Sequence, residues 1–466
     1  MKKKLLMSLL CVSLALGMMA CGQEPGQGES VTEVSEEETA GKAEETETTD
    51  SGAEESASES EAEEAKAVPI LKDAVMEKVG CRIGCAATAS ELQDPKVWEI
   101  ITTHFNAITF GNELKPDCLF DYSNGRVPGI EEAELNGEMI QVPKIGYSRV
   151  TKMLDKVLEW NEQNPDNQIK VRGHVLVWHA QTPEWFFHED YDKTKDYVDK
   201  ETMDKRLEWY IKTVLTHFTG PDSKYKDMFY GWDVVNEAVS DGGGIRTDHE
   251  NPSESLSQDT HGSNSSWYHI YQSDEYIINA FKYANKYAPA DLELYYNDYN
   301  ECTHPKMNSI AELLTKIKEN EGEPGVGTRI SGMGMQGHYD MSNPGMDRIE
   351  LAATTYGKIV GNVQLTELDL KARDSYDGSE ESKKEEYEKQ ASRYRIIYLM
   401  MENTGKKEGI NLTGITFWGT VDHYSWLQSR SNVGGGSTTG LKQCPLLFDE
   451  NYEPKPCFYV FAENKK

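Results

Sequence analysis

The most informative stretches of this chain are residues 232–237 (Trp-Asp-Val-Val-Asn-Glu) and 365–369 (Leu-Thr-Glu-Leu-Asp). Each begins as a run of apolar, β-favouring residues and then reaches a glutamate, Glu237 or Glu367. Other short apolar runs follow along the chain after Ala67 and alternate with amphipathic helical segments. This alternation is typical of a parallel sheet with crossover helices.

Eight such strand-and-helix repeats are expected, and eight repeats close into an α/β fold of the (β/α)₈ TIM barrel type. One helix is expected at 95–104, with Asp94 as its cap and proline at its first position, and another at 383–402. The expected strands lie near residues 82–84, 107–110, 170–177, 229–235, 293–296, 330–335, 363–368 and 414–417.

The barrel is expected to occupy residues 68–466, which is long for a fold of roughly 250 residues. The surplus is placed in segments 121–143 and 241–266, which are rich in Gly, Ser, Asn and Asp. Each follows a strand that ends in a candidate site residue. Both are therefore expected to be loops on the face where those strands end, either shaping a cleft or decorating the surface.

The first twenty residues have the composition of an export signal. Three lysines precede an apolar run, 5–20, that is shorter than the roughly 20 residues of a membrane-spanning helix and is followed at once by Cys21. This pattern predicts a bacterial lipoprotein signal cleaved before Cys21, with a lipid on that cysteine and the protein on the outer face of a membrane. Met18 replaces the usual leucine of such signals, so an ordinary cleaved signal and an uncleaved anchor stay open as alternatives.

Residues 21–67 form an acidic, low-complexity segment between this signal and the barrel. Between positions 24 and 66 there are fifteen Glu and one Asp but only two Lys, with almost no large apolar side chain. Such a segment cannot bury enough surface to offset its ordering entropy, and we expect a disordered, self-repelling linker. The whole chain carries a formal charge of −31, which gives no electrostatic case for nucleic acid as a partner.

The cysteine and histidine spacing predicts no metal site. The eight cysteines include no paired CxxC motif, and the chain has no HExxH helix. Free buried thiols are expected, with a disulfide between Cys81 and Cys85 as the alternative in an exported protein.

The two glutamates are expected to act together. Strand ends converge at one face of a barrel, so groups far apart in sequence can face each other there. Two carboxyl groups in this position can give a proton to a leaving oxygen and oppose the positive charge that develops at an anomeric carbon, as glycosidic bond cleavage requires. A lone glutamate at a strand end is more often a solvated surface group, but two inside such motifs favour the catalytic interpretation.

Further motifs make the chain closely resemble glycoside hydrolase family 10, whose best known members are endo-β-1,4-xylanases. The similarity runs from about Lys78 to Phe461 and includes, in the family's order, residues 172–179 (RGHVLVWH), 296–300 (YNDYN), 335–338 (MQGH) and 416–419 (TFWG), together with the two glutamate motifs. The resemblance implies a glycosidase that needs no cofactor or metal.

The resemblance also implies the roles of the two glutamates. Glu237 would be the general acid/base at the end of the fourth strand, and Glu367 the nucleophile at the end of the seventh. The family retains configuration at the anomeric carbon, which places the carboxyl groups about 5 to 5.5 Å apart.

Several neighbours are expected to position the sugar or the carboxyl groups. Asn236 can donate to the sugar's 2-hydroxyl, and His174 and Trp178, four apart on one expected strand, share a face and line the central subsite. His338 resembles the histidine that hydrogen-bonds the nucleophile, with Asp369 supporting it. A buried core histidine is the alternative for His174 and for His338.

Other residues matching the family's pattern are expected to hold the sugar chain on either side of the cut. Trp418 and Trp426 fit its aromatic walls around the −1 and −2 sugars on the glycone side, and Asn297 and Tyr299 fit its leaving-group side. The remaining implied substrate-binding residues are Gln181, Gln336, Asn112 and Lys115.

One departure from the family pattern lies in segment 111–115. Members commonly have Glu-Asn-x-Met-Lys here, whereas this chain has Gly-Asn-Glu-Leu-Lys, so Gly111 stands in place of a sugar-gripping glutamate. Glu113 is a candidate substitute for that glutamate, although strand alternation would point its side chain elsewhere. Weaker or differently selective binding of the non-reducing-side sugar is expected.

The sequence thus predicts a monomeric, lipid-anchored, retaining endo-1,4-β-xylanase acting on xylan at a bacterial cell surface. Two alternatives remain open at this point. One is a related barrel enzyme that cuts β-1,4-glucan, and the other is a surface lipoprotein that binds polysaccharide without cutting it.

Overall fold

The computed structural model describes residues 68–120, 127–247, 264–429, 432–433, 436–437 and 443–463. The predicted signal, the acidic linker and the lipidation site Cys21 lie outside the described residues. None of the helices in this described part has both the length and the apolar character of a membrane-spanning segment.

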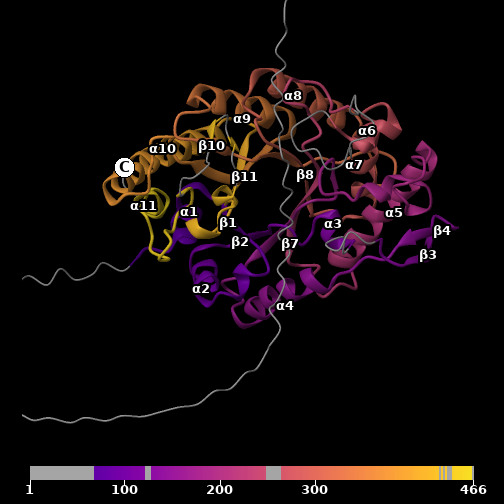
Figure 1. Cartoon of the computed structure of the whole chain (residues 1–466), viewed down its shortest axis with the longest axis horizontal. Coiled ribbons are helices and arrows are strands. Elements are labelled where there is room, and N and C mark those ends of the chain that lie inside the picture. The colour runs from indigo at the N-terminus through magenta and orange to yellow at the C-terminus, as the bar shows by residue number, and fades with distance from the viewer. Residues whose placement is uncertain are drawn as a thin grey trace, which may run out of the picture. The chain divides into compact units, whose positions relative to one another are not determined.

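Eight parallel strands form a closed barrel, as predicted (Figure 1). The ring closes because β11 pairs with β9 as well as with β12. Their side chains are buried along most of their length, which accounts for the continuous apolar runs in the sequence. In ring order the strands are β1 (Arg82–Ala87), β2 (Ala107–Phe110), β5 (Lys170–Gly173), β7 (Phe229–Asn236), β8 (Glu293–Asp298), β9 (Gly332–Met335), β11 (Asn362–Lys371) and β12 (Asn411–Phe417).

Helices surround this barrel, and local capping explains several of their starts (Figure 1). The Asp94 side chain accepts a hydrogen bond from the backbone N–H of Lys96 and Pro95 opens the helix, as expected for 95–104. Asp199 caps α5 in the same manner. The principal helices are α1 (Leu71–Val79), α2 (Pro95–His104), α4 (Ser148–Gln163), α5 (Lys200–Thr219), α7 (Glu275–Tyr287), α8 (His304–Glu319), α9 (Met346–Val360), α10 (Glu380–Gly405) and α11 (Pro456–Ala462), with α3 (Pro116–Leu119) and α6 (Ser266–Tyr271) as short additions.

The expected strand 170–177 is wrong as a single element. The structure divides it into β5 and a two-residue strand, β6 (Val177–Trp178), which pairs with the end of β7. His174 therefore lies in the connection, and strand periodicity is not the reason it lies near Trp178.

Segment 121–143 is also different from the expected loop. Its described part includes an antiparallel hairpin, β3 (Ile130–Leu135) and β4 (Glu138–Pro143). The turn holds Asn136 at φ 53° and Gly137 at φ 88°, and an Asn-Gly pair flanked by alternating residues is the sequence signal for such a hairpin. The hairpin contacts α5 on the outside of the barrel, because Asn136 donates to Glu208 (2.9 Å).

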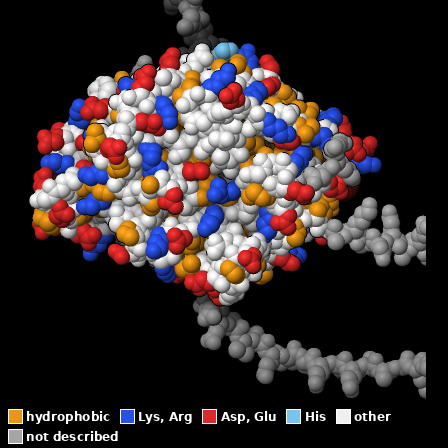
Figure 2. Space-filling view, turned by 180° about the vertical axis from the view of Figure 1, so that it is seen from behind, with side chains coloured by type: hydrophobic (Ala, Val, Ile, Leu, Met, Phe, Trp, Pro, Cys, Tyr) orange, Lys and Arg blue, Asp and Glu red, His pale blue; other side chains and the backbone are white. Residues whose placement is uncertain are grey.

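Acidic and basic side chains are interspersed on the face shown in Figure 2. Cys81 and Cys85 are free, buried thiols, so the alternative disulfide is not formed.

Candidate active site

Glu237 and Glu367 lie at the carboxyl ends of the barrel strands, and both are largely buried, with 9% and 5% of their surface exposed. Glu237 directly follows β7, and its backbone N–H donates to the carbonyl of Asn297 on the neighbouring strand (2.9 Å). Glu367 lies within β11 and donates its N–H to the carbonyl of Gln336 (2.8 Å). Parallel pairing between strands thus fixes both backbones in place.

A chain of amide groups connects the two carboxyl groups. Gln336 donates through Nε2 to Glu237 Oε1 (2.8 Å) and to Asn236 Oδ1 (3.3 Å). Asn297 donates through Nδ2 to the same Asn236 oxygen (2.9 Å) and to Glu367 Oε1 (2.9 Å). The expected residues are therefore brought together in one hydrogen-bonded cluster.

Asn236 contributes an unused donor to this cluster. Its Oδ1 accepts the two amide bonds, but its Nδ2 is buried and has no hydrogen-bond partner among the described residues. Buried donors in folded proteins are almost always paired, and one left open beside a carboxyl group is suited to a ligand. The neighbouring carboxyl of Glu237 accepts from Trp178 Nε1 (2.9 Å).

His338 links Glu367 to a second carboxylate. Its Nε2 lies 3.3 Å from Glu367 Oε2, and its Nδ1 lies 3.0 Å from Asp369 Oδ1. Trp426 Nε1 donates to the other Asp369 oxygen (2.7 Å). The structure thus places Asp369 against the histidine, in the position expected for its support.

These contacts change the pKa of both His338 and Glu367. Burial alone would lower the pKa of His338, but Asp369 and Glu367 outweigh it and raise that pKa to about 10. For Glu367, burial alone would raise the pKa. The hydrogen bond from His338, the nearby charges of His174 and His338, and the hydrogen bond from Asn297 together lower that pKa below its ordinary value. A cationic His338 therefore holds Glu367 ionised at neutral pH.

A buried ion pair lies beneath the site inside the barrel. Arg172 donates to both oxygens of Asp233, through Nη2 at 2.5 Å and Nε at 3.1 Å, and His174 Nδ1 lies 2.9 Å from Asp233 Oδ2. All three side chains are at most 2% exposed. Burial would raise the pKa of Asp233, yet Arg172 and His174 keep it below its ordinary value. Sequence reasoning assigned no role to Arg172 or Asp233, although a charged residue inside a buried strand is a signal for one.

Three tryptophans border the carboxyl pair. The Trp418 ring lies edge-on to His174 (5.7 Å between centroids) and to His338 (6.3 Å), and the Trp426 ring lies 4.8 Å from His338. Lys115 Nζ lies 5.2 Å from the centre of the Trp178 ring. These three indoles are only partly buried, so each retains surface for a ligand.

The segment with the unusual glycine keeps two of its three expected groups at the site. Lys115 is buried and donates to Asn112 Oδ1 (3.1 Å). Burial lowers the pKa of Lys115, while the charges of neighbouring carboxylates, including both Glu367 and Glu237, act in the opposite direction. Glu113 instead accepts from the backbone N–H of Ala89 (2.8 Å), so its side chain is already bound to the β1 loop.

Two residues were expected on the leaving-group side, Asn297 and Tyr299. Asn297 is fully buried, and its amide donates to Asn236 and to Glu367. Tyr299 is partly exposed, with Lys306 Nζ 3.6 Å from its ring centre. Gln181 donates to Asp117 Oδ2 (3.1 Å).

Arg246 is a site residue that sequence reasoning missed. Its guanidinium donates through Nε to the Glu237 carbonyl (2.7 Å) and through Nη2 to the Tyr299 hydroxyl (2.8 Å), and it is 1% exposed. Glu237 has a φ of 54°, an unfavourable conformation for a residue with a side chain, which costs about 1–3 kcal/mol and needs such support. The only sequence signal was an arginine in a segment otherwise rich in Gly, Ser and Asp.

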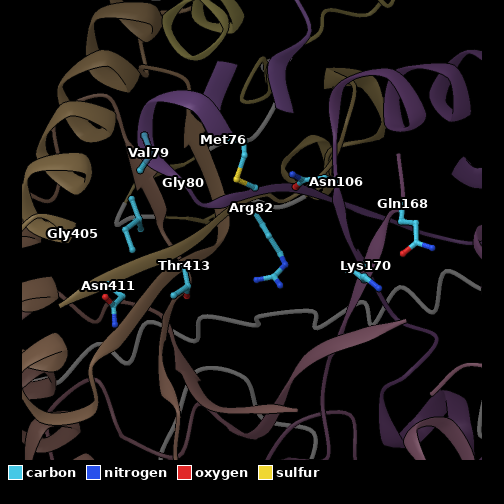
Figure 3. Close-up of a pocket in the computed structure, with 11 residues that line it drawn as sticks. Met76, Val79, Gly80, Arg82, Asn106, Gln168, Lys170, Gly405, Asn411 and Thr413 are labelled. Carbon is cyan, nitrogen blue, oxygen red and sulfur yellow. The ribbon is translucent and has the colours of Figure 1, made fainter. Parts of the chain in front are cut away.

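A separate cavity lies at the opposite, amino-terminal end of the strands (Figure 3). It has a volume of about 590 Å³, and its lining includes Arg82, Lys170 and Asn411, which begin β1, β5 and β12. That end of a barrel serves stability rather than catalysis. Within the described residues there is no cluster of three or more His, Cys, Asp or Glu side chains that could hold a metal ion.

Most of this chain resembles known proteins in sequence. Residues 71–464 match the family model described as glycosyl hydrolase family 10. A putative endo-1,4-β-xylanase of Caldicellulosiruptor saccharolyticus is 37% identical over 306 residues, which is 64% of this chain and 85% of that protein. Endo-1,4-β-xylanase A of Thermotoga maritima is 32% identical over 399 residues, covering 85% of this chain and 31% of that one. The chain spans about a third of the length of several such relatives.

Solved structures give the same result. The CBM22-1–GH10 modules of the Clostridium thermocellum endo-1,4-β-D-xylanase 10B, complexed with xylohexaose, superpose with a TM-score of 0.65 at 29% identity, covering 84% of this chain and 68% of that one. A GH10 endoxylanase from a sugarcane soil metagenome gives 0.63 at 27% identity, covering 85% and 100%.

Proposed function

This chain belongs to glycosyl hydrolase family 10 and is a glycoside hydrolase, and we propose that it is an endo-1,4-β-xylanase that retains configuration by double displacement. The observation that carries the proposal is the hydrogen-bonded cluster in which Gln336, Asn236 and Asn297 join Glu237 to Glu367. The relatives named above as xylanases support the choice of substrate.

In the first step Glu237 protonates the oxygen of the leaving sugar while Glu367 attacks the anomeric carbon and forms a covalent glycosyl-enzyme. Ionised Glu367, held by His338 and Asn297, is ready for this attack. In the second step Glu237 accepts a proton from water, and the hydroxide that forms releases the sugar. One carboxyl group thus acts first as acid and then as base.

The open amide donor of Asn236 supports a role in the transition state. A sugar whose 2-hydroxyl accepts from Asn236 Nδ2 would satisfy a buried group that the protein leaves unpaired. Such bonds strengthen as the ring flattens toward the oxocarbenium ion.

Substrate class is tested by reducing-end release. We expect release from xylan and none from carboxymethylcellulose, because we propose that Trp418 and its neighbours exclude the extra hydroxymethyl group of glucose by steric contact. Comparable release from both would favour a β-1,4-glucanase. A double variant, Glu237→Gln with Glu367→Gln, tests the third possibility, a lipoprotein that binds polysaccharide without cutting it. Such a protein would show no turnover in its wild-type form, and the double variant would bind xylan with unchanged affinity.

His338→Gln is expected to move the acidic limb of the kcat/KM profile to higher pH. Ionised Glu367 is present above its pKa and is lost as the pH falls through it, and the cationic histidine keeps that pKa below the ordinary value. Without the cation the pKa of Glu367 should rise, and the acidic limb should move to higher pH with it. Profiles for wild type, this variant and His217→Gln on α5 would show the effect, and equal limbs in all three would contradict it.

Arg246→Met is expected to lower both stability and kcat. The change leaves the Glu237 carbonyl and the Tyr299 hydroxyl without their buried partner, which costs about 2–4 kcal/mol in the free energy of unfolding. Urea unfolding and xylan turnover measure the two effects. Arg246→Lys keeps the charge but loses the fork that reaches both groups, and it should recover less than half of kcat; full recovery would mean that charge alone matters.

We also propose that lipid on Cys21 anchors the enzyme to the outer face of a membrane. The signal-like composition of residues 1–20 supports this proposal. Mass spectrometry of the N-terminal peptide from membranes should find an acylated Cys21, and soluble, unacylated protein would refute the anchor.

A further inference from the structure

Tyr424 is the only Phe, Trp or Tyr side chain that is exposed in the part of the chain that the structure describes, at 39%. It lies in the short helical turn Asp422–Tyr424, two residues before Trp426. Its ring lies against that of the exposed His423, with centroids 4.0 Å apart, and the His423 ring lies 5.4 Å from that of Tyr452. We refer to His423, Tyr424 and Tyr452 as the rim cluster.

The rim cluster lies at the same end of the barrel as the carboxyl pair. The hydroxyls of Tyr424 (3.1 Å) and Tyr452 (2.6 Å) both donate to Asp94 Oδ2, and Asp94 caps α2 in the connection that follows β1. Because β1 pairs in parallel with β12, the loops after these two strands are neighbours. The cluster therefore joins them at the carboxyl-terminal face.

Its neighbours along this face are groups of the proposed active site. On one side Trp426, in the same loop, donates to Asp369 beneath His338. On the other side the β1 loop is bound to the β2 loop through Ala89 and Glu113, next to Lys115. Tyr424 thus shares a loop with Trp426, and Asp94, which binds it, belongs to the β1 loop that contacts the segment carrying Lys115. The family resemblance implies that Trp426 and Lys115 hold sugars on the glycone side.

The turn that carries Tyr424 is firmly held. Asp422 accepts from Lys455 Nζ (2.8 Å) and from the backbone N–H of Leu446 (2.8 Å), and both members of the ion pair are at most 3% exposed. Leu427, three residues after Tyr424 in the sequence, is fully buried. An exposed aromatic ring on so rigid a support is the arrangement expected of a binding platform.

We propose that Tyr424 is a stacking platform for a sugar residue of the substrate chain, a proposal that rests on the proposed function. This sugar lies on the glycone side, beyond the central subsites. A β-linked pyranose presents a flat C–H face that packs on an aromatic ring and a rim of hydroxyls that bonds to polar groups. The Tyr424 ring packs against the C–H face of the sugar, while His423 and the Asp94 carboxylate form hydrogen bonds to its hydroxyl groups. The same polysaccharide that spans the carboxyl pair is thus held at an additional subsite.

Tyr424→Ala tests this by substrate length. We expect kcat/KM on xylohexaose to fall roughly fivefold to tenfold, the loss of about one aromatic contact, with no change on an aryl β-xylobioside too short to reach the rim. Tyr424→Phe keeps the ring and should match wild type on both substrates. Tyr452→Phe, which loses the same kind of bond to Asp94 without altering the exposed ring, is the matched control and should also match wild type.

Three results would overturn the platform. The first is an unchanged kcat/KM on xylohexaose in Tyr424→Ala, and the second is an equal fall in kcat/KM on both substrates. The third is a fall in either Phe variant as large as that in Tyr424→Ala, which would make the bond to Asp94 responsible rather than the ring. Thermal unfolding of each variant shows whether the fold is kept. A wild-type enzyme inactive on both substrates would instead refute the proposed function itself, and the platform with it.

Discussion

Glu367→Ala should lower turnover of xylan by about 10⁴-fold or more, the largest effect we expect of any single change. In the proposed mechanism this side chain supplies the attacking oxygen, and its removal leaves Asn297 Nδ2 and His338 Nε2 facing a small empty volume. With an activated aryl β-xylobioside, added azide should enter this volume and restore turnover. The product should be the α-glycosyl azide, inverted relative to the substrate, as identified by ¹H NMR.

Glu293→Ala is the matched control for this rescue. Glu293 begins β8 at the opposite end of the barrel, so its loss creates no space beside the substrate. Azide should not affect that variant. Rescue of Glu367→Ala with formation of the β-glycosyl azide would show that Glu367 is not the nucleophile.

Glu237→Ala should separate substrates by their leaving groups. Turnover of xylan, whose leaving oxygen needs a proton, should fall by about 10²- to 10⁴-fold. A dinitrophenyl β-xylobioside leaves without protonation, so its first step should be spared. Because the second step lacks its base, the glycosyl-enzyme should accumulate.

Stopped-flow release of dinitrophenol and mass spectrometry of the intact protein measure these two effects. We expect a burst of about one equivalent of dinitrophenol and a matching increase in protein mass. Equal losses in the Glu237 and Glu367 variants on both kinds of substrate would contradict the roles proposed for them.

Local and periodic signals in the sequence were sufficient to predict the barrel. Helix α2 begins and ends as expected because Asp94 and Pro95 fix its start by short-range hydrogen bonding and backbone geometry. The strands follow from apolar runs that must be buried on both faces. The convergence of Glu237 and Glu367 then follows from barrel topology alone.

The missing parts depend on contacts between distant segments. Neither the bond from Arg246 to the Glu237 carbonyl nor the inward turn of Asn297 is visible in a linear pattern, because each is set by the packing of neighbouring loops and strands. The division of 170–177 into β5 and β6 has the same origin. The hairpin β3–β4 is different, since its Asn136-Gly137 turn was readable in the sequence.

The central claim is that Glu237 and Glu367 cut the bond by two displacements in one pocket. The most direct test is the anomeric configuration of the first product, followed by ¹H NMR during the earliest minutes of xylohexaose hydrolysis. We predict that the β-anomer forms first and equilibrates with the α-anomer only later. Initial formation of the α-anomer would mean a single displacement by water and would contradict the account.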